Sequence, residues 1–345
     1  ALNSMLHDLD EYSSFLAPQA YENMRDDTAG QYGGVGIHVG IRKGVLTVIA
    51  PIEDTPAYRA GLQSGDRIVE IDGEKTEGLT LREAVEKMRG EMGEAVTLGI
   101  DPAAGGDRRD VELKRELIEV PSVKGARVLR DGIGYLRLTQ FARPTAFLLQ
   151  QKLDELFEKD VDALVLDLRS NPGGLLASAI EVTEKFLPRG ELIVSTKGRS
   201  GSGMENESRA GGGVHYADLP LVILVNGGSA SASEIVAGAL QDHKRAIVLG
   251  ETTYGKGSVQ SVIRMRSDEQ SAVRLTTARY YTPDGRSIQA TGIKPDIEVR
   301  PAELKEMDSK PFFTEADLSG HLEGQNEGEQ QDGEADSESE ASAQS

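Results

Sequence analysis

The sequence predicts a multidomain protein of the α/β class (α+β when all domains are counted), with a large layered domain and a small sheet domain. Two patterns support this prediction. From Pro121 onward, apolar runs such as Ala163–Leu168 and Leu221–Val225 alternate with amphipathic helical segments, which is typical of buried parallel strands joined by helices. Between Tyr32 and Leu113, short alternating strands surround one helical segment, which indicates a separate small sheet.

Composition excludes or disfavours several classes of function. The 345 residues carry a formal net charge of −19 without a basic stripe, which disfavours nucleic-acid binding. The absence of cysteine excludes disulfides, thiolate catalysis and cysteine-based metal sites. None of the five histidines forms an H-E-x-x-H pair, so we expect no metal or other cofactor. No apolar run approaches the roughly 20 residues that a membrane-spanning helix needs.

The two ends of the chain have distinct patterns. Ala1 lies in a helical-looking stretch without an initiator methionine, so we expect residues 1–30 to be the remnant of an N-terminal helical region whose targeting segment is missing. Residues 303–345 form a C-terminal extension. From about residue 321 it carries eight acidic residues and no lysine or arginine, which predicts a disordered, solvating tail.

Residues 31–116 contain the elements of one known domain type in order. A glycine-rich loop, Tyr32–Val39, runs into a strand, and the pattern T-P-A-x-x-A-G-L-x-x-G-D spans Thr55–Asp66. A predicted helix, Thr80–Met88, follows. These segments resemble a PDZ domain of the circularly permuted bacterial type, whose groove adds a peptide as an extra strand and binds its carboxylate with converging backbone amides. The resemblance places this groove at Gly34, Val35, Gly36 and Ile37.

A serine-rich segment, Asn226–Glu234, precedes and begins a predicted helix, Ser231–Gln241. A serine hydroxyl is a weak nucleophile that needs a neighbouring base, and the positive end of a helix favours an alkoxide or oxyanion. The amide of Ala232 is free to bind such an oxyanion because first-turn amides lack helical partners. Three alternating serines exceed what one helix cap requires, so capping alone is the weaker interpretation.

A lysine is the better candidate for the base. His243 lies 12 residues past Ser231 near the far end of the same helix, roughly 18 Å away at about 1.5 Å per residue. Lys256 instead lies between two glycines that allow close backbone approach, and Gln260 falls on the same face of the extended segment that follows. The lysine also completes seven positions of a phosphate-binding P-loop pattern, but Gly257 replaces the required serine or threonine, which disfavours nucleotide binding.

From about Leu6 to Val299, the chain resembles the carboxyl-terminal processing proteases, also called tail-specific proteases. The resemblance implies a ClpP/crotonase-like serine protease core over residues 117–302, with the PDZ domain of residues 31–116 inserted before it. The motifs that carry the resemblance are spread along the chain: Leu9–Ser13, Gly134–Leu138, Asp167–Gly174, Ser229–Glu234, Gly250–Gly257 and Tyr280–Gly285.

The resemblance assigns roles to individual side chains. It implies that Ser231 is the nucleophile, Lys256 the general base and Gln260 the partner that orients the base. Arg89, at the end of the PDZ helix, matches a position that can contact the catalytic centre in related enzymes. A regulatory role for Arg89 and a simple helix-terminal charge explain this residue equally well.

The resemblance also implies an oxyanion hole, formed by two backbone amides. One is the amide of Ala232. The other belongs to a glycine of the loop that follows Asn171, either Gly173 or Gly174.

We therefore expect a serine endopeptidase that recognises the C-terminal tails of protein or peptide substrates through its PDZ domain and cleaves them with a Ser–Lys dyad. Family behaviour implies a bacterial periplasmic or cell-envelope location and is compatible with a homodimer and an adaptor protein. The same fold occurs in noncatalytic ligand-binding relatives. The alternative is therefore a PDZ-containing binding scaffold without activity.

Overall fold

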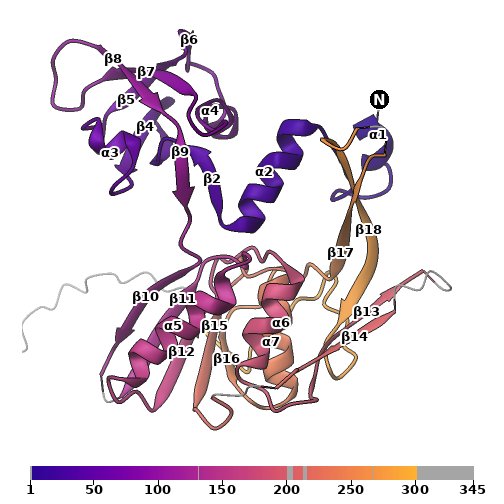
Figure 1. Ribbon diagram of the computed structural model, residues 1–345. Coiled ribbons are helices and arrows are strands. Elements are labelled where there is room, and N and C mark those ends of the chain that lie inside the picture. The colour runs from indigo at the N-terminus through magenta and orange to yellow at the C-terminus, as the bar shows by residue number, and fades with distance from the viewer. Residues whose placement is uncertain (1, 131, 200–204, 213–215, 267, 301–345) are drawn as a thin grey trace, which may run out of the picture. The chain divides into compact units, whose positions relative to one another are not determined.

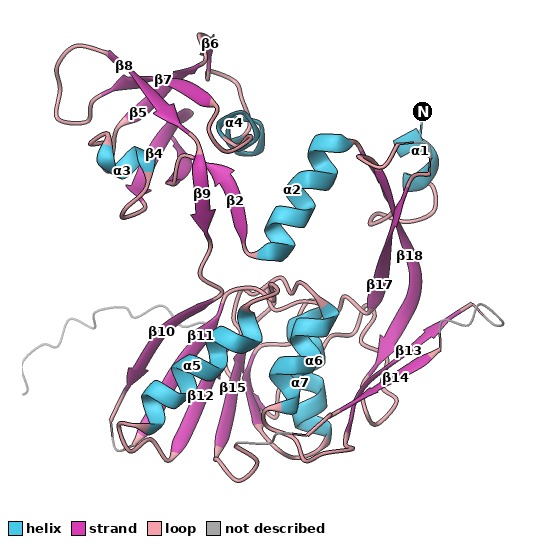
Figure 2. Ribbon diagram, viewed as in Figure 1, coloured by secondary structure: helices cyan, strands magenta, loops and turns pink. Residues whose placement is uncertain are grey.

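The computed structural model describes residues 2–130, 132–199, 205–212, 216–266 and 268–300 (Figure 1). The predicted extension and acidic tail over residues 303–345 lie outside the described residues. The described strands form three larger sheets and one two-stranded ribbon, as Figure 2 shows by colour. None of the described helices is long and apolar enough to cross a membrane.

The N-terminal half of the chain contains a small antiparallel sheet. Its strands are β3 (Ile37–Arg42), β4 (Val45–Pro51), β5 (Arg67–Ile71), β6 (Glu74–Lys75), β7 (Ala95–Asp101) and β8 (Arg109–Lys114). They pair in the order β3-β4-β5-β7-β8, with β6 on β5. Two helices, α3 (Pro56–Arg59) and α4 (Leu81–Met88), lie between the strands in sequence. Val48, Ile68 and Leu98 of the sheet form one buried cluster with Ala84 and Met88 of α4.

The start of α4 is specified by a capping box. The hydroxyl of Thr80 accepts the amide of Glu83 at 3.3 Å, and the carboxylate of Glu83 accepts the amide of Thr80 at 2.8 Å. These bonds satisfy amides that have no partner within the helix. The helix ends at Met88, as predicted, because Arg89 takes an extended backbone conformation.

The residues before and after the small sheet form a separate ribbon and a helical segment. The segment comprises α1 (Leu2–His7), β1 (Ser14–Leu16) and α2 (Pro18–Ala29). Gly30 ends α2 in the left-handed conformation, with φ of 76°, which favours glycine at this position. The ribbon consists of β2 (Gln31–Gly34) paired antiparallel with β9 (Glu116–Glu119).

The large layered domain is built on a six-stranded sheet. Its strands are β10 (Val123–Val128), β11 (Ile133–Leu138), β12 (Ala163–Asp167), β15 (Leu221–Val225), β16 (Ile247–Gly250) and β19 (Ile297–Glu298). All neighbours are parallel except β10, which is antiparallel to β11. Three helices lie in front of this sheet in Figure 2: α5 (Thr145–Phe157), α6 (Leu176–Glu184) and α7 (Ala232–Asp242). The core buries Leu166 of β12, Ile223 of β15 and Val236 of α7 completely.

The parallel strands bring the loops of interest to one edge of the sheet. Asp167 pairs with Leu224 across β12 and β15, and Val225 pairs with Gly250 across β15 and β16. Because the carboxyl ends of neighbouring parallel strands meet at the same edge, the loops that follow β12, β15 and β16 converge.

A third sheet adds a long strand to this edge. It contains β13 (Leu192–Gly198), β14 (Asn206–Arg209), β17 (Ser258–Arg264) and β18 (Ala272–Tyr281), together with β1. β1 pairs with the start of β18, and β13 pairs with its end. β18 also pairs with β17, which directly follows the loop that carries Lys256. The strand β18 therefore links this loop to the N-terminal segment.

Candidate active site

Ser231 lies at the turn between β15 and α7. It is the N-cap residue of α7, and its φ of 56° and ψ of −112° are unusual for a residue with a side chain. Only 9% of the residue is exposed. Its hydroxyl therefore lies at the positive end of a helix, in a buried setting that strengthens electrostatic stabilisation of negative charge.

The neighbouring serines of the motif have structural partners. Ser229 donates its hydroxyl hydrogen bond to the Leu168 carbonyl at 2.8 Å and accepts the Asn226 amide at 3.0 Å. Ser233 donates to the Asn171 carbonyl at 2.9 Å. Both serines are completely buried. The structure thus gives the outer two serines a role in holding loops together, whereas the hydroxyl of Ser231 lies against the Tyr280 hydroxyl.

Lys256 lies between Gly255 and Gly257 on the loop after β16. Gly255 has φ of 90°, a conformation that side chains rarely adopt, so glycine is required here. The lysine is half-buried, and its Nζ lies 4.5 Å from the centre of the Tyr12 ring. Tyr12 comes from the N-terminal segment, which is more than 200 residues away in sequence.

The surroundings of Lys256 favour its neutral form. Burial lowers the pKa of Lys256, the positive charge of Arg274 lowers it further, and the carboxylate of Glu234 opposes both effects. A lysine can act as a general base near neutral pH only when its pKa is lowered in this way. The direction of this pKa shift is the one that a general-base lysine needs.

A single buried carboxylate, which we call the Glu234 clamp, joins the two loops. One oxygen of Glu234 accepts the amides of Ser231 at 2.7 Å and Lys256 at 2.9 Å. The other accepts the Thr253 hydroxyl at 2.5 Å and the Gly255 amide at 2.7 Å. Glu234 has no exposed surface. Because a buried carboxylate must be fully hydrogen-bonded, these four donors fix the backbone of residue 231 relative to that of residue 256.

The side chains of the two residues have other partners. The Ser231 Oγ lies 2.8 Å from the Tyr280 Oη. Within the part of the chain that the structure describes, no hydrogen bond joins Ser231 to Lys256. Gln260 forms a hydrogen bond with neither Ser231 nor Lys256 among the described residues. Its Nε2 donates to the Ser258 hydroxyl at 3.0 Å and to the Thr276 hydroxyl at 3.2 Å.

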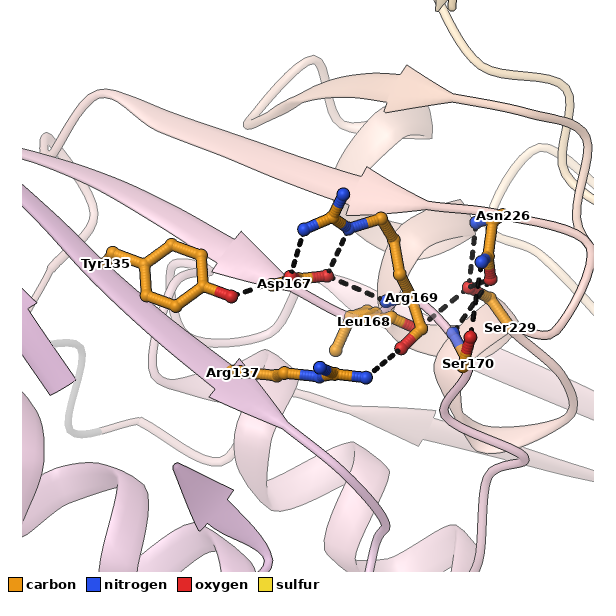
Figure 3. Close-up of polar contacts among 8 residues, drawn as sticks. All are labelled: Tyr135, Arg137, Asp167, Leu168, Arg169, Ser170, Asn226 and Ser229. Atoms are coloured by element: carbon orange, nitrogen blue, oxygen red, sulfur yellow. Dashed lines mark hydrogen bonds and ion pairs between the residues drawn. The ribbon is translucent and has the colours of Figure 1, made fainter. Parts of the chain in front are cut away.

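The loop after β12 begins at an ion pair between the buried Asp167 and the half-exposed Arg169, shown in Figure 3. Asp167 accepts the Tyr135 hydroxyl at 2.7 Å, the Arg169 amide at 2.9 Å and the guanidinium of Arg169 at 2.7 and 2.9 Å. Burial acts to raise the pKa of Asp167, but the hydrogen bonds from Arg169 and Tyr135 outweigh it and hold the pKa below its usual value.

The same loop is hydrogen-bonded to the turn between β15 and α7, which we call the serine turn. Figure 3 shows Asn226 facing Ser170, and the Asn226 Oδ1 accepts the amides of Ser170 at 2.8 Å and Gly228 at 3.1 Å. The Asn226 Nδ2 donates to the Ser170 hydroxyl at 3.2 Å. These contacts hold the loop after β12, which contains Gly173 and Gly174 and which we call the glycine loop, beside the start of α7.

The glycine loop approaches Ser231 closely. A Cβ on Gly173 would lie 2.9 Å from both the Ala232 amide nitrogen and the Ser231 Cβ, so only glycine fits. The Gly173 amide donates to the Asn171 Oδ1 at 2.9 Å. Among the described residues, no acceptor binds the amide of Ala232 or that of Gly174. Two amides, one at the start of α7 and one in the loop after β12, therefore have no acceptor among these residues.

The residues predicted for the peptide groove line a small pocket, of about 30 Å³. Gly34, Val35, Gly36 and Ile37 line it together with residues of α4. A Cβ on Gly36 would lie 2.3 Å from the Thr55 Cβ, which excludes other residues there. Arg89 also lines the groove, with its guanidinium 4.4 Å from the Tyr32 ring centre and 3.0 Å from the Asp27 carboxylate of α2. No catalytic candidate contacts Arg89 among the described residues.

His243 has the position expected from the helix length. It is the C-cap residue of α7, and its Nε2 lies 2.7 Å from the Leu192 carbonyl oxygen. This contact confirms it as a helix-terminal residue. Across the described ranges, no group of three or more histidine, aspartate or glutamate side chains could hold a metal ion.

Comparison with known proteins identifies the family. The model of peptidase family S41 matches residues 132–299, and a PDZ domain model matches residues 47–101. The chain is 46% identical to a carboxy-terminal-processing protease of Bartonella bacilliformis over 331 residues, which cover 94% of this chain and 75% of that protein. The chain belongs to the carboxyl-terminal processing proteases of peptidase family S41. It is thus a serine peptidase with a PDZ domain.

Further similarities support the family and the fold. A carboxyl-terminal-processing protease of Synechocystis is 40% identical over 304 residues, which cover 86% of this chain and 69% of that protein. The solved structure of the photosystem II D1 C-terminal processing protease matches with a TM-score of 0.53 and 34% identity, over 86% of this chain and 80% of that one. The predicted multidomain α/β organisation and the predicted family are therefore confirmed.

Three residues of this S41 site were missed by the sequence analysis. Glu234 had a usable signal, because a glutamate three residues after an N-cap serine commonly binds the N-cap amide. Tyr12 and Tyr280 lie within motifs of the family resemblance, but those motifs gave neither residue a role. Tyr12 reaches the site through the pairing of β1 with β18, and Tyr280 lies at the other end of β18, which pairs with β13.

Replacement of Asp167 tests how much its charge stabilises the protein at the start of the loop after β12. Replacing Asp167 by Asn should lower the free energy of unfolding at pH 7 by about 1–3 kcal/mol, because charge-assisted hydrogen bonds in a buried site are lost. The stabilisation from a carboxyl group with a lowered pKa is present above its unfolded pKa and is lost as the pH falls through its folded pKa. The difference should therefore shrink below about pH 4.

Urea unfolding at pH 7 and pH 3 measures this effect. Asp107→Asn, at an exposed position, is the control and should change neither value. An Asp167→Asn difference of equal size at both pH values would contradict the assigned role of the charge.

Proposed function

We propose that this S41 peptidase is an endopeptidase that binds the C-terminal tail of a protein or peptide in its PDZ groove and cleaves it with Ser231 and Lys256. The observation that carries the proposal is the Glu234 clamp, because one buried carboxylate binds the amides of both residues. The lowered pKa of Lys256 supports its role as the base. The structural partners of Ser229 and Ser233 support Ser231 as the nucleophile.

Acylation follows from these roles. The neutral amine of Lys256 takes the proton of the Ser231 hydroxyl while the Oγ attacks the carbonyl carbon of the scissile peptide bond. The carbonyl oxygen becomes an oxyanion. When the intermediate collapses, the C–N bond breaks, and the lysine ammonium returns its proton to the leaving amine. An ester between the substrate acyl group and Ser231 remains.

Deacylation repeats the sequence with water. Water gives a proton to Lys256 and its oxygen attacks the ester carbon, and the Ser231 Oγ leaves and recovers the proton. The flexible four-carbon stem of lysine allows the Nζ to move from the Tyr12 ring to the Ser231 hydroxyl. Gln260, two residues from Ser258 on the same strand face, orients the amine in this second position.

Two amides stabilise the oxyanion. We assign them to Ala232, at the start of α7, and to a glycine of the loop after β12. Gly174 is the better candidate for the second donor, because the Gly173 amide already binds the Asn171 side chain. Gly173 allows the close approach of the loop to Ser231.

The remaining assignments concern the domains and their regulation. We place the PDZ domain at residues 31–116 and the protease core at residues 117–302. Arg89 is proposed as a regulatory residue, supported by its position in the groove and its ion pair with Asp27 of α2. A periplasmic or cell-envelope location, a homodimer and an adaptor protein are proposals that rest on the family resemblance alone.

Mass-spectrometric digestion of a protein with and without an apolar C-terminal tail tests this function. We expect cleavage of the tailed protein at least about ten times faster, because a groove-bound tail raises the local substrate concentration. Val85→Lys, which puts a charge into the groove, should abolish this preference. Glu86→Lys, on the exposed side of the same helix, should retain it.

The same experiment separates the alternative. A wild-type protein that binds the tailed protein but cleaves neither form would indicate a noncatalytic scaffold. Equal cleavage of both forms would contradict tail recognition.

A further inference from the structure

Tyr280 is the group that touches the proposed nucleophile. Its Oη lies 2.8 Å from the Ser231 Oγ, at the end of β18. We propose that Tyr280 is a further catalytic residue, whose phenol donates a hydrogen bond to the Ser231 oxygen as negative charge develops on it. The inference rests on the proposed function, because it gives Tyr280 a role in the reaction of Ser231.

The backbone holds Tyr280 in register with both catalytic segments. Its amide donates to the carbonyl of Gly257 at 2.9 Å, the residue next to Lys256. On its other side, it pairs with Thr196 of β13. The phenol is thus fixed from two strands and aimed at the serine turn.

The hydroxyl of Tyr280 has one hydrogen-bond partner in the part of the chain that the structure describes. Only 4% of the residue is exposed, and its ring belongs to the large hydrophobic core. Within the described residues, Ser231 is the one hydrogen-bond partner of its Oη. Filling this space requires only an apolar ring, and burial of an extra hydroxyl costs free energy unless it is hydrogen-bonded. The hydroxyl is therefore best explained by what it does for Ser231.

The phenol remains a donor over the working pH range. Burial raises the pKa of Tyr280 to about 12, the hydrogen bond between Tyr280 and Ser231 acts to lower it, and the charges of Glu234 and Tyr12 act to raise it. The ionisable groups that face it are Glu234 of α7 and Tyr12 of the N-terminal segment, with Lys256 on the loop bonded to its backbone.

Donation by Tyr280 is compatible with the proposed base. A serine oxygen has one proton and two acceptor positions. Ser231 can therefore accept from Tyr280 while its own proton passes to Lys256. The same bond stabilises the Oγ a second time, when the ester bond breaks and the oxygen leaves.

Tyr280→Phe tests this role, with Tyr281→Phe as the matched control on the next residue. Fluorophosphonate labelling of Ser231 and peptide cleavage are both measured. We expect Tyr280→Phe to lower the labelling rate and kcat by roughly 10- to 100-fold with KM unchanged, since hydrogen bonds to charged groups contribute about 1.5–3 kcal/mol. Tyr281→Phe should keep both rates.

The outcomes separate this inference from the proposed function. Tyr280→Phe with rates equal to or above the wild type would overturn the role of Tyr280, since the phenol would then only restrain the serine. If the Ser231→Ala variant is labelled at the same rate as the wild type, the proposed function would instead be overturned.

A second measurement avoids removal of the hydroxyl. A fluorinated tyrosine at position 280 keeps the ring and the phenol but lowers the phenol pKa. Because a phenolate cannot donate, kcat/KM should fall on the alkaline side at a lower pH than in the wild type. An unmoved alkaline limb would contradict the proposal.

Discussion

Replacement of Ser231 by alanine is expected to abolish cleavage of tailed substrates, with a loss of at least about 10⁴-fold in kcat/KM, and to leave the fold intact. The loss is this large because removal of a nucleophile eliminates the covalent pathway, and only binding and oxyanion stabilisation remain. Cleavage followed by mass spectrometry measures the rate, and thermal unfolding checks the fold.

The neighbouring serines are the matched controls. Ser229→Ala and Ser233→Ala each remove a buried hydrogen bond and should lower the free energy of unfolding by about 1–3 kcal/mol. Both variants should retain cleavage when folded. Retained cleavage in Ser231→Ala, or a folded Ser233→Ala that is inactive, would show that the nucleophile has been assigned to the wrong serine.

Replacement of Lys256 has the second large expected effect. Lys256→Ala and Lys256→Arg should each lower kcat/KM by about 10²- to 10⁴-fold, because alanine has no base and a guanidinium does not release its proton. In the wild type, kcat/KM should rise with pH as the ammonium loses its proton. Since the pKa of Lys256 is lowered, the midpoint should lie below the usual value of about 10.4 for lysine.

Lys185 is a matched control for burial. Burial also lowers the pKa of Lys185, but its Nζ binds Gln150 away from the site. Lys185→Ala should therefore keep the wild-type rate and pH profile. A flat profile in the wild type, or equal losses in Lys185→Ala and Lys256→Ala, would contradict the assignment of the base.

Lys256 also affects how the stability of the protein depends on pH. A lysine whose folded pKa is lowered binds fewer protons in the folded than in the unfolded state, so stability rises with pH until the unfolded pKa is passed. Lys256→Met should therefore be at least as stable as the wild type at pH 7, and its advantage should shrink towards about pH 10.

Local patterns were sufficient for the elements that carry the nucleophile. The apolar run Leu221–Val225 predicted β15 with the bounds that the structure has. The helix predicted from Ser231 begins at Ala232, with the serine as its N-cap. Small residues between a buried strand and a helix can form few structures other than a sharp turn, so the turn that carries Ser231, the proposed nucleophile, followed from short-range rules.

Long-range pairing accounts for what could not be predicted. Tyr12 reaches Lys256 because β1 pairs with β18, and Tyr280 reaches Ser231 because the other end of β18 pairs with β13. Both tyrosines lie within motifs of the family resemblance, but their local sequence does not show which distant side chains they contact. The side chain of Gln260 illustrates the converse, because it lies beside Ser258 as expected but contacts Ser258 and Thr276 rather than Lys256.

The most direct test is the site and pH dependence of covalent labelling by a fluorophosphonate, with peptide mapping of the product. We expect one labelled residue, Ser231, at a rate that rises with pH in the wild type and falls by at least about 100-fold in Lys256→Ala. Label on a different serine, or an unchanged rate in Lys256→Ala, would contradict a serine nucleophile activated by this lysine.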